Sequence, residues 1–394
     1  ALDYLDDVKG SIEDKAYVAA QAYALRAFFY FNLVNLFGEP YNYNKDADGV
    51  PLKLTSSLSS SSEKRETVAK VYEQIVKDLN AAEENFLALS ADRQGKVGYR
   101  INLPVQLLHA RVCLYMEDME GAAKYAKKVI DNWGYELYDL TSFKKDTTIV
   151  VGKNASYPSY VSLDNPETIW VYGNAADFNG IIGAQDKMEN GTTYAYFVNA
   201  SRDLITCYED EEDLRKTLYL VEELRGPLGA KPEELKFAEG HYLPWSKCVM
   251  QYNNKVKSGT EYGMSFRLSE AYLILAEAVY ATDEVLALKM INELREKRYA
   301  EGADYEVHYS GESLLNFIRE ERRRELCFEG QRWFDLRRYG MPSFEHRWVE
   351  YGDNLGSYVI EEKDAAYTLP IPTEVINRNS ALNQNKLTTT KTLQ

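Results

Sequence analysis

The sequence contains few of the residues that usually carry catalysis or metal binding. Its 394 residues include only four cysteines and four histidines, which are scattered along the chain without CxxC, HExxH or facial-triad spacing. GxGxxG, P-loop and GxSxG motifs are absent as well, which argues against nucleotide binding and against an α/β-hydrolase nucleophile. We therefore expect buried free thiols, no metal ion, no cofactor and no enzymatic activity.

Positive charge is also scarce. Lys and Arg number 46 against 61 Asp and Glu, which gives a net charge of −15. Because a chain of this charge repels polyanions, we exclude nucleic acids and anionic membrane surfaces as partners. Neutral and cationic ligands stay open.

Apolar runs of membrane length are missing. The nearest candidate, 17–37, contains Arg26 near its middle, where an arginine costs about 2.5–3.5 kcal/mol in a bilayer. We therefore interpret this run as a core helix of a water-soluble fold. The chain opens at Ala1 without the basic and apolar stretches of a leader peptide, so we expect any targeting segment to have been removed or to lie upstream.

Tyrosine, in contrast, is abundant, with 31 residues against 14 Phe and 5 Trp. A flat apolar ring with a hydroxyl suits surfaces that bind amphipathic ligands such as sugars or peptides. Tyrosine can equally replace phenylalanine at half-buried helix positions. The composition alone leaves both explanations open.

Helical periodicity is strongest near the start of the chain. An apolar face with steps of three and four residues comprises Val18, Ala22, Leu25, Phe29, Leu33 and Leu36. A parallel stripe of small residues, suited to the close approach of another helix, comprises Ala16, Ala20, Ala24 and Ala27. Gly38 and Pro40 predict the end of this helix.

Further helices are predicted over 68–89, 104–114, 122–130 and, as a second pair, 265–299. Helix pairs with a period near 34 residues are typical of tetratricopeptide-like repeats. The expected fold is therefore dominated by α-helices, with tetratricopeptide-like pairs forming a right-handed superhelical scaffold, a large irregular loop-rich insertion and short β-strands. We divide the chain into N-terminal helices (1–134), an aromatic-rich insertion as candidate ligand face (135–262), C-terminal helices (263–340) and an extended segment (341–394), all packed as one domain.

Two patterns suggest chemistry only weakly. Residues 44–49 resemble the start of a calcium loop, but Thr55 occupies the twelfth position, where a bidentate glutamate is required. The acidic run 209–213 offers paired carboxylates of the glycosidase kind, yet such runs are usually solvated surface. We expect neither to be functional.

The densest charged segment is EERRRELCFEGQRWFDLRR, residues 320–338. Helical spacing predicts that Glu320 approaches Arg324, Glu329 approaches Arg332 and Asp335 approaches Arg338. We interpret the segment as a partly buried ion-pair network. The residues assigned to this network are Arg26, Glu325, Glu329, Arg332, Asp335 and Arg337.

Four ordered motifs give the chain a resemblance to a known family. EERRRELCFEGQRWFDLRRYG (320–340) resembles the signature of the SusD/RagB family of outer-membrane nutrient-binding lipoproteins. ALRAFFYFNLVNLFGEPY (24–41), FRLSEAYLILAEAVY (266–280) and LPIPTEVINRNSALNQN (369–385) are similar to three further family segments in the expected order. Family members usually carry a lipidated cysteine and a longer segment ahead of the first motif, so we expect a truncated chain or a short subgroup.

The resemblance implies a cell-surface lipoprotein of the outer membrane, with its lipid anchor absent from this chain. Such a protein binds oligosaccharides or polysaccharides without turnover and delivers them to a SusC-like TonB-dependent transporter. A peptide-binding member of the same family is the first alternative. An intracellular tetratricopeptide adaptor is the second, although it would need a basic groove.

Ligand residues are chosen by chemistry, because the family's binding loops vary. Sugars stack their CH groups on flat rings, while amide groups hold their hydroxyls. The candidates after the first helix are Tyr41, Asn42, Tyr43 and Asn44. The candidates in the insertion are Tyr194, Tyr196, Phe197, Tyr242 and Trp245.

Overall fold

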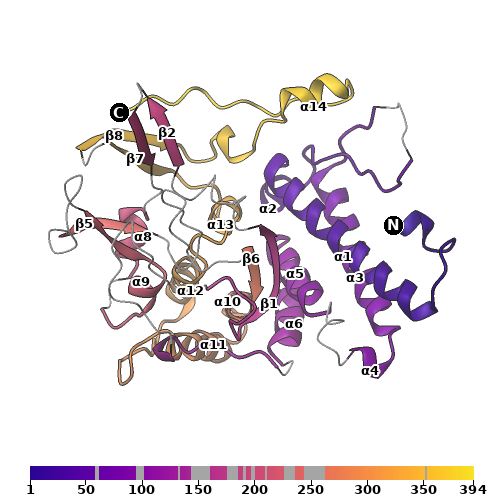
Figure 1. Cartoon of the computed structure of the whole chain (residues 1–394), viewed down its shortest axis with the longest axis horizontal. Coiled ribbons are helices and arrows are strands. Elements are labelled where there is room, and N and C mark those ends of the chain that lie inside the picture. The colour runs from indigo at the N-terminus through magenta and orange to yellow at the C-terminus, as the bar shows by residue number, and fades with distance from the viewer. Residues whose placement is uncertain are drawn as a thin grey trace. The chain divides into compact units, whose positions relative to one another are not determined.

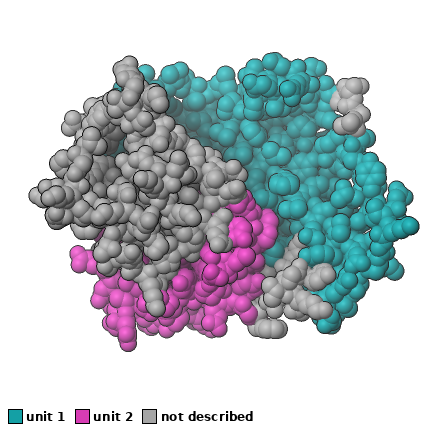
Figure 2. All heavy atoms as spheres, in the orientation of Figure 1, with its two compact units in different colours: residues 1–125, 333–394 teal, residues 126–332 magenta. Residues whose placement is uncertain are grey.

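The computed structural model describes residues 1–57, 62–94, 102–131, 134–142, 160–174, 185–189, 192–196, 200–208, 211–225, 236–243, 262–350 and 353–394. Helices dominate these residues, and their strands form only two-stranded sheets, which confirms the predicted fold class (Figure 1). The chain forms two compact units (Figure 2). Unit 1 comprises 1–125 and 333–394, and unit 2 comprises 126–332. Unit 1 is therefore discontinuous in sequence.

Helix α1 (Ile12–Phe37) has clear start and end signals. The Ser11 side chain accepts a hydrogen bond from the Asp14 backbone N–H at 3.1 Å, and the Asp14 carboxylate accepts one from the Ser11 N–H, which completes a capping box. Gly38 ends the helix as predicted. A Cβ there would lie 2.9 Å from the Val34 carbonyl oxygen, so only glycine allows this close approach.

Helices α1 and α3 (Val68–Leu87) pack antiparallel in unit 1. Ala16 and Ala20 contact Phe86 at one end, and the Phe31 ring lies 6.3 Å from that of Tyr72 at the other. The small side chains allow this approach, as the alanine stripe predicted.

The apolar face predicted for α1 is wrong in its orientation. Val18, Leu25, Phe29 and Leu33 are 41%, 41%, 57% and 40% exposed. Helix α3 packs instead against the alanine stripe, because small residues permit the closest contact. The larger apolar side chains on the neighbouring face are left partly exposed.

The remaining helices of the first segment are α2 (Tyr41–Asn44), α4 (Ala91–Gln94), α5 (Asn102–Tyr115) and α6 (Met119–Ile130). The periodicity predicts α5 and α6 but not the one-turn helices α2 and α4. Pro104 lies in the first turn of α5, and Glu117 takes a positive φ of 61° in the turn between α5 and α6. This pair confirms the helices expected over 104–130.

Unit 2 contains the second predicted pair, α10 (Leu268–Val279) and α11 (Glu284–Glu296), followed by α12 (Gly311–Glu325). The Asp283 side chain caps α11 by accepting from the Leu286 N–H at 3.0 Å. Two short helices, α8 (Arg202–Thr206) and α9 (Arg215–Leu218), precede them. Helix α10 is buried along almost its whole length, and its buried carboxylates Glu270 and Glu277 pair with Arg322 and Arg319, at 3.5 and 3.4 Å.

Among the residues of unit 2 that the structure describes, the strands form three antiparallel pairs. They are β1 (Thr168–Asn174) with β6 (Tyr262–Arg267), β2 (Gln185–Glu189) with β3 (Thr192–Tyr196), and β4 (Val221–Arg225) with β5 (Lys236–Leu243). The run at 168–172 was predicted to be β-like and lies in β1. Short pairs of this kind leave the helices as the main scaffold.

Unit 1 closes with the C-terminal elements. They are α13 (Arg332–Arg338, from Trp333 onward in this unit), β7 (Phe344–Glu350), β8 (Asp353–Ile360) and α14 (Thr373–Arg378). Strands β7 and β8 form an antiparallel hairpin. Gln394 exchanges two backbone hydrogen bonds with Ser357, at 2.9 and 3.0 Å, so the tail runs along β8.

In the part of the chain that the structure describes, every helix is too short or too polar to cross a membrane.

Candidate ligand-binding surface

A buried ion-pair network holds unit 2 together. Three arginines, Arg215, Arg267 and Arg298, are each at most 1% exposed. All three donate to the Glu325 carboxylate, at 3.2, 2.5 and 2.9 Å respectively. Because burying one ion costs several kcal/mol, such a group is stable only when charges and hydrogen bonds compensate one another.

The network is electrically balanced. Its arginines are Arg215, Arg267, Arg295, Arg298 and Arg324, and its carboxylates are Asp213, Glu167, Glu321, Glu325 and Glu329. Burial by itself raises the pKa of Glu321, but the neighbouring guanidinium groups outweigh this effect and lower the pKa to about 2. The Glu321 carboxylate therefore remains ionised at any physiological pH.

The local pairing predicted within 320–338 is partly wrong. Arg324 bonds to Glu321 at 2.8 Å, whereas Glu320 accepts a hydrogen bond from Cys207 Sγ at 3.2 Å. Helix α12 ends at Glu325, and Phe328 and Gly330 take positive φ before α13 begins. Residue 329 therefore lies outside both helices, and its predicted approach to Arg332 stays a prediction.

Glu329 binds Arg267 of β6 at 2.7 Å, a partner 62 residues away in sequence. The predicted approach of Asp335 to Arg338 is present, with 3.0 Å between Asp335 Oδ1 and Arg338 Nε. Arg332 is the first residue of α13.

Two further arginines assigned to the network act within unit 1. Arg26 makes a bidentate pair with buried Asp78, with both N–O distances 2.7 Å. Arg337 donates to the carbonyl oxygens of Gly38 and Tyr367, and burial lowers its pKa to about 10. It thereby joins the end of α1 to the C-terminal segment.

The four candidates of α2 divide into two kinds. Asn42 donates to the Glu117 carboxylate at 3.0 Å and to the Arg338 carbonyl at 2.8 Å, and the Tyr41 ring packs 4.9 Å from that of Tyr72. Tyr43 is 53% exposed, and Asn44 is also exposed. The turn therefore presents one open ring and one amide beside two side chains that support the fold.

The candidates of the insertion are less fully described. Tyr194 and Tyr196 lie in β3 at register positions opposite Lys187 and Gln185, and Tyr242 lies in β5 opposite Glu222. Phe197 and Trp245 lie outside the described residues. All five stay predictions.

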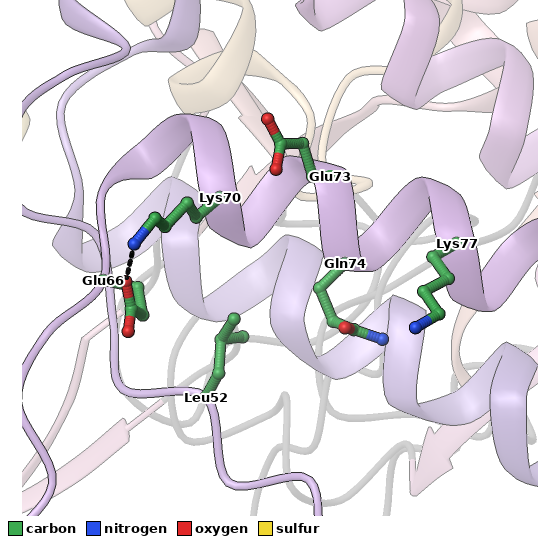
Figure 3. A pocket seen from close by; sticks show the side chains of 6 residues that line it. All are labelled: Leu52, Glu66, Lys70, Glu73, Gln74 and Lys77. Atoms are coloured by element: carbon green, nitrogen blue, oxygen red, sulfur yellow. Dashed lines mark hydrogen bonds and ion pairs between the residues drawn. The ribbon is translucent and has the colours of Figure 1, made fainter.

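A hollow of about 330 Å³ lies on the surface of α3 (Figure 3). Its lining residues are Leu52, Glu66, Lys70, Glu73, Gln74 and Lys77. Lys70 and Glu66 form an ion pair at 2.9 Å, and none of the six side chains is aromatic. The hollow could hold a polar group but offers no ring for stacking against a sugar.

Two exposed rings on the C-terminal hairpin lie outside the set of predicted ligand residues. Trp348 of β7 and Tyr358 of β8 are 46% and 37% exposed, and their centroids lie 6.4 Å apart. The alternation of Phe344, His346 and Trp348 is a strand signal in the sequence, and it would have placed these three side chains on one face of the strand.

Comparisons with known proteins connect this scaffold to one family. Residues 222–387 match the family model described as the SusD family, and residues 1–102 match one described as starch-binding and associating with the outer membrane. SusD-like protein P2 of Formosa agariphila is 28% identical over 392 residues, covering 93% of this chain and 73% of that protein.

Solved structures agree with this family assignment. A SusD superfamily protein from Bacteroides thetaiotaomicron has a TM-score of 0.70 at 25% identity, covering 96% of this chain and 80% of that one. A SusD-like carbohydrate-binding protein from Bacteroides vulgatus has a TM-score of 0.68 at 21% identity, covering 98% and 81%. The chain is a SusD-like family protein with the tetratricopeptide-like helical fold of these structures. The family description supports glycan binding and association with the outer membrane.

Proposed function

We propose that the protein binds oligosaccharides or polysaccharides at the cell surface without turnover and delivers them to a SusC-like TonB-dependent transporter. The observation that carries the proposal is the match of both ends of the chain to SusD family models, one of which is described as starch-binding. A lipid anchor ahead of residue 1 would hold the protein at the outer membrane.

The described residues suit a binding role. Amide and hydroxyl groups can hold sugar hydroxyls, and an exposed ring can stack on the apolar face of a pyranose. Tyr43 and Asn44, which are consecutive residues of α2, offer one exposed ring and one exposed amide. We propose these two residues as ligand contacts, together with the insertion residues Tyr194, Tyr196 and Tyr242.

The buried ion-pair network supports a binding role because it makes unit 2 rigid. Glu325 of α12 pairs with Arg267 of β6 and with Arg298, which follows α11. These ion pairs connect segments that are distant in sequence and so make the unit that carries the insertion rigid. A site on a rigid scaffold loses little conformational entropy on binding. Sugars gain little free energy per hydroxyl group, so this saving matters for their affinity.

Binding and turnover are tested together. The purified chain is run through native gels containing soluble starch, xylan, galactomannan or β-glucan, and the best ligand is then measured by calorimetry. We expect retardation by at least one polysaccharide, and no shortened products by chromatography after prolonged incubation. Release of products that depends on a single carboxylate would indicate an enzyme instead. Binding of peptides but of no glycan would indicate the peptide-binding alternative.

Delivery to a transporter is tested separately. The full-length protein, carrying an affinity tag, is purified from detergent-solubilised outer membranes of its source cells. We expect a TonB-dependent transporter to copurify in a stoichiometric amount. Purification without such a protein would contradict the delivery step and leave glycan binding standing.

A further inference from the structure

The hairpin β7–β8 carries a row of aromatic rings on one face. His346 pairs with Tyr358 and Trp348 pairs with Gly356 in the strand register. Because side chains alternate along a strand, Phe344, His346, Trp348 and Tyr358 share a face. The row runs from a partly buried ring, Phe344, to the exposed ring of Trp348.

The inner end of the row is held firmly by the core of unit 1. The Phe344 ring lies 6.3 Å from that of Trp333 and 6.1 Å from that of Tyr367, and these two rings stack at 4.8 Å. Tyr367 is fully buried, and its hydroxyl donates to the Pro342 carbonyl at 2.5 Å. The hairpin is therefore oriented before any ligand arrives.

The outer end of the row forms an open corner. The Trp348 and Tyr358 rings meet at 87° with their centroids 6.4 Å apart. Gly356 stands opposite Trp348 in the register, and the tail occupies the space where its side chain would lie, with Leu393 Cγ 2.9 Å from that position. The Trp348 side chain is 46% exposed beside this contact. A Cβ at Gly356 would lie only 2.5 Å from the Gln394 carbonyl oxygen, which requires glycine there.

The chemistry of this corner favours a neutral sugar. A flat indole matches the apolar CH face of a pyranose, while the perpendicular phenol can contact the edge of the same ring and offers a hydroxyl. The net charge of −15 acts against an anionic chain or an anionic membrane as the ligand. We propose that Trp348 and Tyr358 form a stacking platform for one pyranose ring of a neutral glycan.

This platform rests on the proposed glycan-binding function and adds a contact to it. It lies on β7–β8, whereas the residues proposed above lie on α2, β3 and β5. A polysaccharide that contacts the protein at more than one place gains affinity through effective concentration. The platform is therefore expected to matter most for long ligands.

The test compares single variants of the whole chain. Affinity for the best-bound polysaccharide among soluble starch, xylan, galactomannan and β-glucan is measured by native gel retardation. We expect Trp348→Ala to weaken binding roughly three- to tenfold. Tyr358→Ala should weaken it less, and Trp348→Phe should retain most of the affinity. Thermal melting of each variant confirms that it is folded.

Tyr309→Ala is the matched control. Tyr309 is 46% exposed, like Trp348, but lies between α11 and α12. We expect this variant to bind as the parent does. Unchanged affinity in Trp348→Ala, with a parent that binds, would overturn the platform and leave the proposed function intact. If the unsubstituted protein binds none of the four polysaccharides, both the platform and the proposed function are overturned. Displacement of the bound glycan by a tryptic casein digest would also overturn both.

Discussion

Neutralising one buried carboxylate should destabilise unit 2 severely. Glu325 is fully buried and accepts from Arg267, Arg298 and Arg215, with the shortest distance 2.5 Å. It also accepts from the Tyr219 hydroxyl at 3.2 Å. Glu325→Gln keeps the size of the side chain but removes its charge and directs an NH₂ group toward guanidinium donors.

The expected magnitude follows from the balance of the network. The variant leaves five buried arginines facing four carboxylates, and breaking a buried ion pair costs about 3–5 kcal/mol because one charge stays uncompensated. The network spreads the excess charge over several groups, so we expect a loss near 3 kcal/mol. This is a large share of the roughly 5–15 kcal/mol by which domains are stable.

The assay is urea unfolding followed by circular dichroism at pH 7. Glu293→Gln serves as the control, because the pair that Glu293 forms with Lys289 at 3.7 Å is exposed. This substitution should change the free energy of unfolding by less than about 1 kcal/mol. If Glu325→Gln costs no more than this control, the network does not stabilise the fold as argued.

Three further predictions follow from single contacts. The pKa of Glu321 is lowered from 4.5 to about 2, so its contribution to stability is complete above pH 4.5 and is lost as the pH falls toward 2. Urea midpoints measured across this pH range should fall with the pH. In Glu321→Gln, this fall of the midpoint should be smaller. Arg26→Ala leaves the carboxylate of Asp78, which is 1% exposed, without its bidentate partner and should lower the free energy of unfolding by about 2–4 kcal/mol in the same assay. Tyr43→Ala should weaken glycan binding in calorimetry with an unchanged melting temperature. Tyr41→Ala should lower the melting temperature, because the Tyr41 ring packs on the buried ring of Tyr72. A lowered melting temperature of Tyr43→Ala would contradict the assignment of Tyr43 to ligand binding and of Tyr41 to the fold.

Local periodicity predicted the helices well but not the direction in which they face. The steps of three and four at Val18, Leu25 and Phe29 correctly indicated α1. The same helix carries a second row of small side chains, and packing favoured that row, as buried Ala20 and Ala27 show. Two apolar rows on one helix have the same period, so the sequence alone does not decide which of them is covered.

The ion-pair segment shows a similar limit. Its high density of charge and apolar residues indicated a buried network, and Glu321, Glu325 and Glu329 are in fact buried. Their partners Arg215 and Arg267 lie 58 or more residues away in sequence, where no helical spacing connects them. Local rules assign only local partners, so the pairing predicted between positions 320 and 324 failed.

For the candidate site, the type of residue could be predicted from the sequence, but not which individual residues are exposed. An excess of tyrosine suggested open rings, yet the exposure of Tyr43 and the burial of Tyr72 depend on the packing of α2 and α3. Trp348 was overlooked because one tryptophan in a charged stretch has no helical signal, and its neighbour Tyr358 comes from the other strand of a hairpin.

The discontinuity of unit 1 sets an order of events during synthesis. Residues 126–332 emerge as one continuous stretch and contain every charge of the buried network, so unit 2 can form while translation or secretion is still under way. The first helices emerge earlier but wait for residues 333–394, since Asn42 needs the Arg338 carbonyl and Gly38 needs Arg337, which is 299 residues later. The C-terminal end of α1 is accordingly the last part of this helix to gain its partners, because the carbonyl groups of Leu36 and Phe37 accept hydrogen bonds from the late residues Leu369 and Asn385.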